Sequence, residues 1–365
     1  MELSNNKSIL QWNCRGFWPN FEELKSLISN FSPYILALQE THFKESDNVN
    51  IRGFKHYFKT SVSEVDGRAI GGSSIFVKNG VPHEVLELDT ELQAVAVKVS
   101  LHKTITVCNV YIPPRFNLAQ SDLDNLVNQL PAPFLFIGDF NAHSDLWGCS
   151  STNSFGTKVE HLLESSNICL LNDKSPTYFH PATGSFTSID LSLCCASILL
   201  DFSWQVHNDQ CGSDHFPILI DIIKGMPKEN VPRWNLKKAD WSKFQLQCSL
   251  DINRHNFTDS TEKFPAFLNK INGIATKCVP KSTGQSTGSY KSWFNSECKK
   301  AVKARQNAMD KCRINPTSVN INEYKNCRAN ARKIIKENKK KSWHEYVSKL
   351  NVKIPAKKVW EMIGK

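Results

Sequence analysis

Short apolar segments of strand length recur along residues 8–222, and polar side chains able to do chemistry stand at the ends of several of them. The expected strands cover residues 8–12, 34–38, 74–77, 92–101, 104–111, 134–137, 188–193 and 216–222. Helical patterns cover only residues 21–29, 121–130 and 157–164, and Pro19 is a helix-start signal for the first of them. Many strands with few helices predict an α/β (α+β) fold in which two packed sheets are flanked by helices.

The longest expected strand, residues 92–101, has a regular alternation of apolar positions. Leu92, Ala94 and Ala96 fall on one face, and Val95, Val97 and Val99 fall on the other, as the period of two of a strand requires. Alternation of this kind is typical of a half-buried antiparallel strand, which is what we predict here.

Charge divides the 365-residue chain into two unequal parts. Residues 1–223 hold 14 Lys and Arg against 24 Asp and Glu, a net charge of −10. Residues 224–365 hold 31 against 11, a net charge of +20. This asymmetry favours a basic segment that binds a polyanion, although a solvated, lysine-rich helical face is the simpler alternative.

Composition changes near residue 224, where glycine and proline mark a linker over 224–232. A Gly/Ser/Thr-rich stretch over 282–292 predicts flexibility, and a basic helical pattern begins at residue 293. We therefore expect a main domain over 1–223, a partly flexible linker over 224–292 and a basic helical region over 293–365.

Cysteine usage and hydropathy exclude several classes of protein. The 12 cysteines form no Cys-x-x-Cys pair, so zinc ribbons find no support. The N-terminal residues lack the apolar core of a secretory signal, and no apolar run is long enough to span a membrane. We expect no membrane partner and a location in the nucleus or the cytoplasm. The oligomeric state is open.

The tetrapeptide Gly138-Asp139-Phe140-Asn141 directly follows the apolar run 134–137. In α/β proteins the groups at the carboxyl ends of strands form the functional site. If the extended geometry persists, Asp139 and Asn141 face the same side, where one activates a water and the other donates to a phosphoryl oxygen. The alternative is a Gly-Asp-x-Asn turn in which both residues only hold the backbone.

Other strand ends carry compatible groups. Glu40 suits Mg²⁺, which takes hard oxygen ligands; a simply exposed carboxylate is the alternative. Asp214 and His215 are adjacent, so a turn must present both, and a protonated His215 held by Asp190 would stabilise charge on a phosphate. Tyr111 ends the run 105–110, where its hydroxyl either binds phosphate or belongs to the core. These ends predict one shared site for a divalent cation and a phosphate ester.

Six motifs in order resemble the endonuclease/exonuclease/phosphatase superfamily, which includes DNase I and apurinic/apyrimidinic endonucleases. They are Trp12-Asn13, Gln39-Glu40-Thr41, Asn109-Val110-Tyr111-Ile112-Pro113, Gly138-Asp139-Phe140-Asn141, Ser188-Ile189-Asp190 and Ser213-Asp214-His215. More narrowly, GDFNAHSDLWG (138–148) is similar to the endonuclease domain of jockey-like non-LTR retrotransposons, and Arg233-Trp234-Asn235 onward looks like the region before their reverse transcriptase. No Asp-Asp polymerase motif appears, so the resemblance implies a reading frame cut off before its polymerase, or a remnant.

The resemblance implies a four-layer, DNase I-like α/β sandwich of two mixed sheets, followed by the basic helices. It also implies a role for each matched residue. At the metal, Glu40 is the ligand, with Asn13 close by and Asp214 beside the ion. Asp139 activates the water, Asn141 and Tyr111 position the phosphate, and His215, held by Asp190, contacts the scissile phosphate. Arg15 stands where many relatives have an acid, which puts a second metal in doubt. We expect Arg15 and Arg115 to contact nucleic acid.

The predicted function is a Mg²⁺-dependent endonuclease, with Mn²⁺ as an alternative metal. It nicks double-stranded DNA to leave a 3′-hydroxyl and a 5′-phosphate that serve target-primed reverse transcription, while the basic region binds RNA or DNA. The alternatives are a phosphoinositide or sphingolipid phosphatase or phosphodiesterase of the same fold, a DNA-repair enzyme, and an inactive, domesticated nucleic-acid-binding protein.

Overall fold

The computed structural model describes residues 8–63, 66–165, 167–223, 234, 236–252, 263–281 and 293–348. These residues divide into two compact units, one that takes in the described residues up to 223 and from 293 onward, and one that takes in those between 234 and 281. The linker expected at 224–232 and the flexible stretch expected at 282–292 lie outside the described residues.

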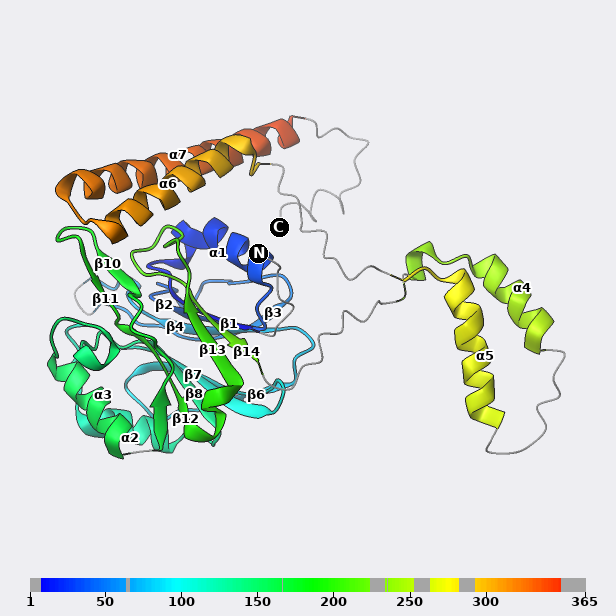
Figure 1. The fold of residues 1–365 in the computed structure, drawn as a ribbon, viewed down its shortest axis with the longest axis horizontal. Coiled ribbons are helices and arrows are strands. Elements are labelled where there is room, and N and C mark those ends of the chain that lie inside the picture. The colour runs from blue at the N-terminus through cyan, green and yellow to red at the C-terminus, as the bar shows by residue number, and fades with distance from the viewer. Residues whose placement is uncertain are drawn as a thin grey trace. The chain divides into compact units, whose positions relative to one another are not determined.

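The first large sheet has six strands in the order β13-β14-β1-β2-β4-β3 (Figure 1). Their bounds are β1 Ser8–Asn13, β2 Ile35–Gln39, β3 Phe54–Lys59, β4 Ser73–Lys78, β13 Phe202–Val206 and β14 Ile218–Ile222. The β1–β2 pair is parallel and the other neighbours are antiparallel, so the sheet is mixed.

The second large sheet also has six strands, in the order β5-β6-β7-β8-β12-β9. Their bounds are β5 His83–Leu86, β6 Gln93–Ser100, β7 Thr104–Tyr111, β8 Phe134–Asp139, β9 Ile168–Leu170 and β12 Asp190–Cys195. Here β7 and β8 form the parallel pair. A separate hairpin joins β10 (Tyr178–His180) and β11 (Ser185–Thr187). The eight strands expected from the sequence are confirmed with shifted ends, and β3, β5, β9, β10, β11 and β13 were not expected.

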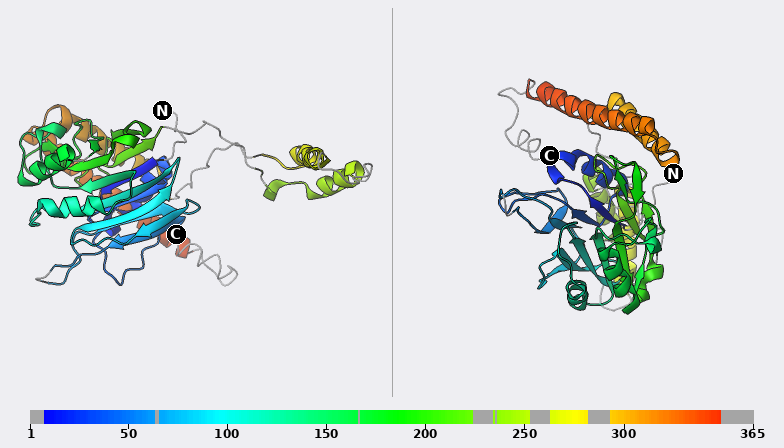
Figure 2. Two further views of the ribbon diagram at one scale, coloured as in Figure 1. Left: turned by 90° about the horizontal axis from the view of Figure 1, so that it is seen from below. Right: turned by 90° about the vertical axis from the view of Figure 1, so that its left-hand side faces the viewer.

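Three apolar cores explain the layers. One lies between the two sheets and is built from Ile, Val, Ala and Leu of both. A second packs α1 (Phe17–Phe31) on the outer face of the first sheet, and a third packs α2 (Gln120–Asn128) and α3 (Ser154–Ser165) on the outer face of the second. The order helix, sheet, sheet, helix confirms the predicted four-layer α/β sandwich (Figure 2).

Strand β6 corrects one expectation. The sequence predicted a half-buried strand, which holds for the end of β6, where Lys98 and Ser100 are exposed, but over residues 94–97 both faces are buried. Ala94 and Ala96 face the core under α2 and α3, whereas the valines face the other sheet. Over residues 94–97 the alternation therefore separates two buried faces, with small side chains under the helices and larger ones between the sheets.

Buried polar side chains cross between the two sheets. The amide of Asn109 on β7 donates to the carbonyl oxygens of Leu38 and Ser74, both at 3.0 Å, in the opposite sheet. Gln11 on β1 donates to the carbonyl oxygen of Gly138 on β8, also at 3.0 Å. Because a buried polar group without a partner is costly, these bonds favour one register of the sheets. That register sets the ends of β1, β2, β7 and β8 against one another.

Two further helices belong to the same unit, α6 (Ser296–Ile314) and α7 (Ser318–Val347). The Asn295 side chain caps α6 by accepting from the backbone N–H of Cys298 at 3.1 Å. The two helices lie side by side (Figure 1), and Met309 and Ile321 pack with Phe179 and Phe216 of the sandwich.

The second unit contains α4 (Trp241–Ile252) and α5 (Lys263–Cys278), so part of the expected linker is helical. The short helices at Asp145–Trp147, Ala196–Asp201 and Leu236–Lys238 are 3₁₀ turns. Within the described residues, no helix combines the length and the apolar character needed to cross a membrane.

Candidate active site

The candidate site lies where matching ends of the two sheets meet. In the second sheet, Tyr111, Asp139 and Asp190 are direct partners across β7, β8 and β12. In the first sheet, Asn13 is the partner of Gln39, the residue before Glu40. One strand register on each sheet therefore brings side chains from distant parts of the sequence to one edge.

Glu40 follows β2 in a left-handed backbone conformation, with φ of 48°, which is uncommon for this residue type. Its carbonyl oxygen accepts from the N–H of Gly16 at 2.7 Å, which holds the turn. The Asn13 side-chain amide donates to Glu40 Oε1 at 2.9 Å and to Asp139 Oδ2 at 2.7 Å. Asn13 thus ties the carboxylates of the two sheets together.

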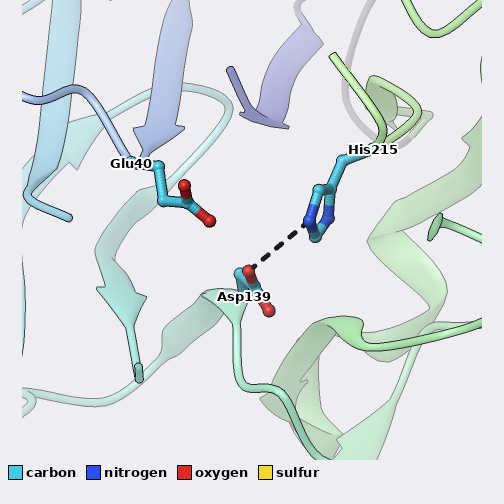
Figure 3. Close-up of side chains that lie close together, drawn as sticks. All are labelled: Glu40, Asp139 and His215. Carbon is cyan, nitrogen blue, oxygen red and sulfur yellow. Dashed lines mark ion pairs between the residues drawn. The ribbon is translucent and has the colours of Figure 1, made fainter. Parts of the chain in front are cut away.

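Glu40, Asp139 and His215 form a cluster whose candidate ligand atoms all lie within 4.8 Å of one another (Figure 3). His215 Nε2 is 3.9 Å from Asp139 Oδ2, the pair joined by the dashed line in Figure 3. Two carboxylates suit a hard divalent cation, which needs few protein ligands and keeps waters. The donor set present therefore fits Mg²⁺ or Mn²⁺.

Gly138 allows β8 to approach β7 closely, because a Cβ at this position would lie 1.9 Å from the carbonyl oxygen of Val110. The strand ends at Asp139, and Asn141 is left-handed with φ of 48°. Of the two alternatives that the sequence left open, the backbone therefore follows the turn, which brings Asn141 to the site. Its N–H donates to Asp139 Oδ1 at 3.0 Å, and its Nδ2 donates to the carbonyl oxygen of Ile112 at 3.0 Å.

His215 is held through both its side chain and its backbone. Its Nδ1 lies 2.8 Å and 3.0 Å from the two carboxylate oxygens of Asp190. The indole N–H of Trp12 donates to its carbonyl oxygen at 3.2 Å. With Nδ1 occupied by Asp190, Nε2 is the nitrogen that faces Asp139 and the cavity.

Burial and charge set the protonation of the cluster. Burial raises the pKa of the Asp139 carboxyl, the charges of Asp190 and Glu40 add to this, and His215 only partly offsets it, so the pKa rises to about 8. Burial lowers the pKa of His215, but Asp190 and Asp139 outweigh it and raise the pKa to about 10. Burial raises the pKa of Glu40, yet hydrogen bonding to His42, the charge of His215 and the Asn13 amide bring it to about 2.

Asp214 lies beside this cluster and forms an ion pair with Arg15. The Asp214 side chain is 7% exposed, whereas that of Arg15 is 55% exposed, so the arginine reaches solvent at the edge of the site. Both residues line the same cavity as Asp139 and His215. A turn between β13 and β14 presents Asp214 and His215 together.

The two remaining predicted residues differ in their distance from the cluster. Tyr111 ends β7, is 7% exposed and bonds through its hydroxyl to Glu40; burial raises the pKa of this hydroxyl, and the charges of Glu40 and Asp139 add to this, so it stays protonated. Arg115 is exposed in the turn after β7 and is not among the residues that line the cavity.

The cavity has a volume of about 370 Å³ and includes residues that the sequence did not single out. Tyr178, His180, Ser185 and Thr187 come from the β10–β11 hairpin, and the Tyr178 ring lies 4.7 Å from that of His215. The strands of this hairpin have three residues each, too short for apolar periodicity to reveal. The hairpin forms one wall of the site.

Comparison with known sequences agrees with this geometry. Residues 105–219 match the family described as Endonuclease-reverse transcriptase. The chain is 28% identical over 255 residues to a probable RNA-directed DNA polymerase from transposon X-element of Drosophila melanogaster, covering 67% of this chain and 27% of the relative. It is 22% identical over 280 residues to the polymerase of mobile element jockey from Drosophila funebris, covering 74% and 30%. The chain thus spans under a third of the length of these relatives.

Comparison with solved structures identifies the fold. The endonuclease domain of TRAS1, a telomere-specific non-LTR retrotransposon, matches with a TM-score of 0.51 and 22% identity over 60% of this chain and 98% of that domain. The AP endonuclease LMAP from Leishmania major matches with a TM-score of 0.50 and 13% identity over 62% and 90%. The predicted DNase I-like fold and the resemblance to retrotransposon endonucleases are therefore confirmed.

Proposed function

We propose that this chain is a Mg²⁺-dependent endonuclease, related to those of jockey-like retrotransposons, that nicks DNA to leave a 3′-hydroxyl and a 5′-phosphate. The 3′-hydroxyl would prime reverse transcription at the target. The observation that carries the proposal is the convergence of Glu40, Asp139 and His215 within 4.8 Å at the matched ends of two sheets. The sequence similarity to retrotransposon polymerases over 67–74% of the chain supports the same assignment.

Glu40 would hold the metal, with Asn13 and Asp214 beside it, while Asp139 is kept for the attacking water. A divalent ion bound there would supply Lewis-acid stabilisation of the phosphate. Arg15 forms an ion pair with Asp214 and neutralises its negative charge, which would otherwise favour binding of a second metal ion. We propose Mg²⁺ as the natural ion and Mn²⁺ as a substitute.

Asp139 and His215 have separate catalytic roles. Asp139, with a pKa raised to about 8, is a stronger base than an ordinary carboxylate and takes a proton from the attacking water. His215, with a pKa raised to about 10, is protonated at neutral pH, and its Nε2–H faces the charge that develops on the phosphate. Uncatalysed phosphate-ester hydrolysis is extremely slow, so this positioned charge and proton transfer have a large barrier to lower.

Asn141 and Tyr111 would position the substrate. One amide hydrogen of Asn141 goes to the carbonyl oxygen of Ile112, which leaves the second for a phosphoryl oxygen in the cavity that Asn141 lines. The Tyr111 hydroxyl stays protonated and bonds to Glu40, beside which it would meet the phosphate. Fixed donors of this kind lower the barrier because they need no reorganisation during the reaction.

The proposed partners are double-stranded DNA at the cavity and RNA or DNA along the basic helices. Arg15 at the cavity edge, and Arg115 beyond it, would contact the DNA backbone. Lys299, Lys300 and Lys303 are exposed on α6 and would bind phosphates without reading sequence. We propose nuclease activity for the domain over 1–223, binding by the region over 293–365, and action in the nucleus or cytoplasm.

The test is a direct comparison of substrates with the full chain. We expect Mg²⁺-dependent conversion of supercoiled plasmid to open circles, and no release of phosphate from phosphoinositide vesicles. The nicks should be extended by a DNA polymerase without prior phosphatase treatment, because they end in a 3′-hydroxyl. Preference for an abasic duplex over an intact one would instead identify a repair enzyme. Hydrolysis of the lipid alone would identify a lipid phosphatase, and inactivity on both would identify a binding protein.

A further inference from the structure

The segment from His207 to His215, here called the site loop, delivers Asp214 and His215 to the cavity. It passes through two consecutive left-handed residues, Cys211 with φ of 53° and Gly212 with φ of 92°. A Cβ at Gly212 would lie 2.4 Å from Asn20 Oδ1, so the loop also runs close against α1. A backbone of this kind persists only where surrounding contacts hold it.

The sandwich supplies only some of these contacts. Ser213 Oγ donates to the carbonyl oxygen of Asn13 at 2.8 Å, and Trp12 donates to that of His215. These bonds connect the end of the site loop to β1. The backbone N–H of Phe179 on β10 donates to the carbonyl oxygen of Asp214 at 3.0 Å. The bonds printed for the carbonyl oxygen of Gly212 come from α7.

Helix α7 binds the carbonyl oxygen of Gly212 directly and reaches that of Asp214 through Gln210 of the site loop. The Tyr324 hydroxyl donates to Gln210 Oε1, and Gln210 Nε2 donates in turn to the carbonyl oxygen of Asp214. Arg328 Nη2 donates to the carbonyl oxygen of Gly212 at 2.6 Å, and Arg332 donates to the same oxygen. Gln210 and Tyr324 are both 1% exposed, so the bond between them is shielded from water. The two arginine bonds are only partly buried, and Arg332 is exposed.

Helix α6 fixes α7 in place against the sandwich. Arg305, 1% exposed, binds Glu23 Oε1 of α1 and Asp209 Oδ2 of the site loop, each at 2.7 Å. Met309 and Ile321 pack with Phe216, the residue after His215. The helix pair therefore contacts the site loop through charge, hydrogen bonds and apolar packing.

We propose that α6 and α7 brace the site loop, and that Tyr324, Arg328 and Arg332 are positioning residues for Asp214 and His215. They touch neither the metal site nor the substrate and act through Gln210 and the Gly212 carbonyl. The consequence for cleavage rests on the proposed nuclease function. A displacement of about 1 Å in a catalytic group lowers the rate on the order of 100-fold, so loosening this loop lowers kcat.

The experiment uses the full chain and two brace variants, Tyr324→Phe and the double variant Arg328→Ala with Arg332→Ala. Tyr57→Phe is the matched control for the first, since it removes a hydroxyl bonded to His83 at 2.9 Å. Arg52→Ala with Arg68→Ala is the control for the second, since it removes the same charge from two exposed arginines. Hydrogen–deuterium exchange of peptides covering 207–216 is measured beside kcat and KM for plasmid nicking in Mg²⁺.

We expect exchange in 207–216 to be about 10-fold faster in both brace variants, because the loop opens more often. We expect kcat to fall roughly 10- to 100-fold while KM changes less than about threefold. Both controls should match the wild type in exchange and in kcat.

Unchanged exchange in both brace variants would overturn the proposal. Faster exchange with unchanged kcat would overturn its catalytic part, and a raised KM at constant kcat would reassign the arginines to DNA binding. If the wild-type chain does not nick DNA, the proposed nuclease function fails, while the exchange comparison still decides whether the helices brace the loop.

Discussion

Nδ1 of His215 lies 2.8 Å from Oδ2 of Asp190, and both side chains are buried at the end of the second sheet. The carboxylate fixes the ring orientation and raises the pKa of the imidazole, whereas burial alone would lower it. The pair turns Nε2 toward Asp139, 3.9 Å away, where it can meet the substrate phosphate. The charge on this ring therefore depends on Asp190, a residue that does not line the cavity.

Asp190→Asn tests that dependence. The carboxamide keeps the shape of the side chain but no longer stabilises the imidazolium, so the pKa of His215 should fall. We expect kcat for plasmid nicking to drop about 10²- to 10⁴-fold with a small change in KM. NMR titration of the His215 ring should give a lower pKa than in the wild type. A variant with kcat within twofold of wild type would remove the imidazolium from the mechanism.

Asp214→Ala should abolish Mg²⁺-dependent nicking without unfolding the domain. The change removes an acid from the cavity and frees Arg15, which would then place uncompensated positive charge beside the cation. Asp66→Ala is the matched control, because Asp66 also pairs with an arginine, Arg68, but at the surface. Circular dichroism checks the fold. Nicking by Asp214→Ala at a near-normal rate would refute the placement of this residue.

The basic face of α6 should set the salt dependence of DNA binding. Replacing Lys299, Lys300 and Lys303 by Gln should flatten the slope of log Kd against log salt by up to about 0.9 for each DNA phosphate that the variant no longer neutralises. The triple Lys→Arg variant keeps the charge and should keep the slope. Fluorescence anisotropy with a short duplex gives both slopes. Equal slopes for the Gln variant and the wild type would exclude this face from DNA binding.

His56, which lies outside the candidate site, should make the free energy of unfolding depend on pH. Its ring stacks on Phe76 at 4.1 Å and on Phe58 at 4.7 Å, and burial lowers its pKa to about 4 from an ordinary 6.5. Between these values the unfolded chain binds the proton and the folded chain does not. The free energy of unfolding therefore keeps the whole contribution of neutral His56 above pH 6.5. It loses up to about 3 kcal/mol of this contribution as the pH falls toward 4.

Urea unfolding at pH 7, 5.5 and 4.5 measures that loss, with His56→Phe as the comparison. The variant keeps an aromatic ring in the stack and has no group to protonate, so its unfolding free energy should fall less over this range. If variant and wild type lose stability in parallel, His56 is not the source.

The pattern of apolar segments was enough to predict the sandwich, because each core face draws on residues at strand or helix spacing. It could not tell whether β6 has one or two buried faces, since a strand between helices and a sheet alternates as a half-exposed one does. Likewise, Asn141 reaches the site through a left-handed turn, and the sequence could not decide between such a turn and an extended strand.

The brace on the site loop could not be predicted from the sequence at all. Gln210 and Tyr324 are 114 residues apart, and a Tyr in a basic helix has an ordinary core role by its spacing alone. Only the packing of α7 against the site loop brings the hydroxyl of Tyr324 to the side-chain amide of Gln210. The same limit applies to Arg115, whose position after β7 suggested a DNA contact but which lies outside the cavity.

The central claim is that Glu40 holds the cation that the nicking reaction needs. Plasmid nicking by wild type and Glu40→Gln across a Mg²⁺ titration tests it most directly. Gln has the same size and can still bond to Asn13, so the fold should be kept while a metal ligand charge is lost. We expect at least a roughly 100-fold lower maximal rate and a higher half-saturating Mg²⁺ concentration. Equal rates and equal Mg²⁺ dependence in the two proteins would contradict the account.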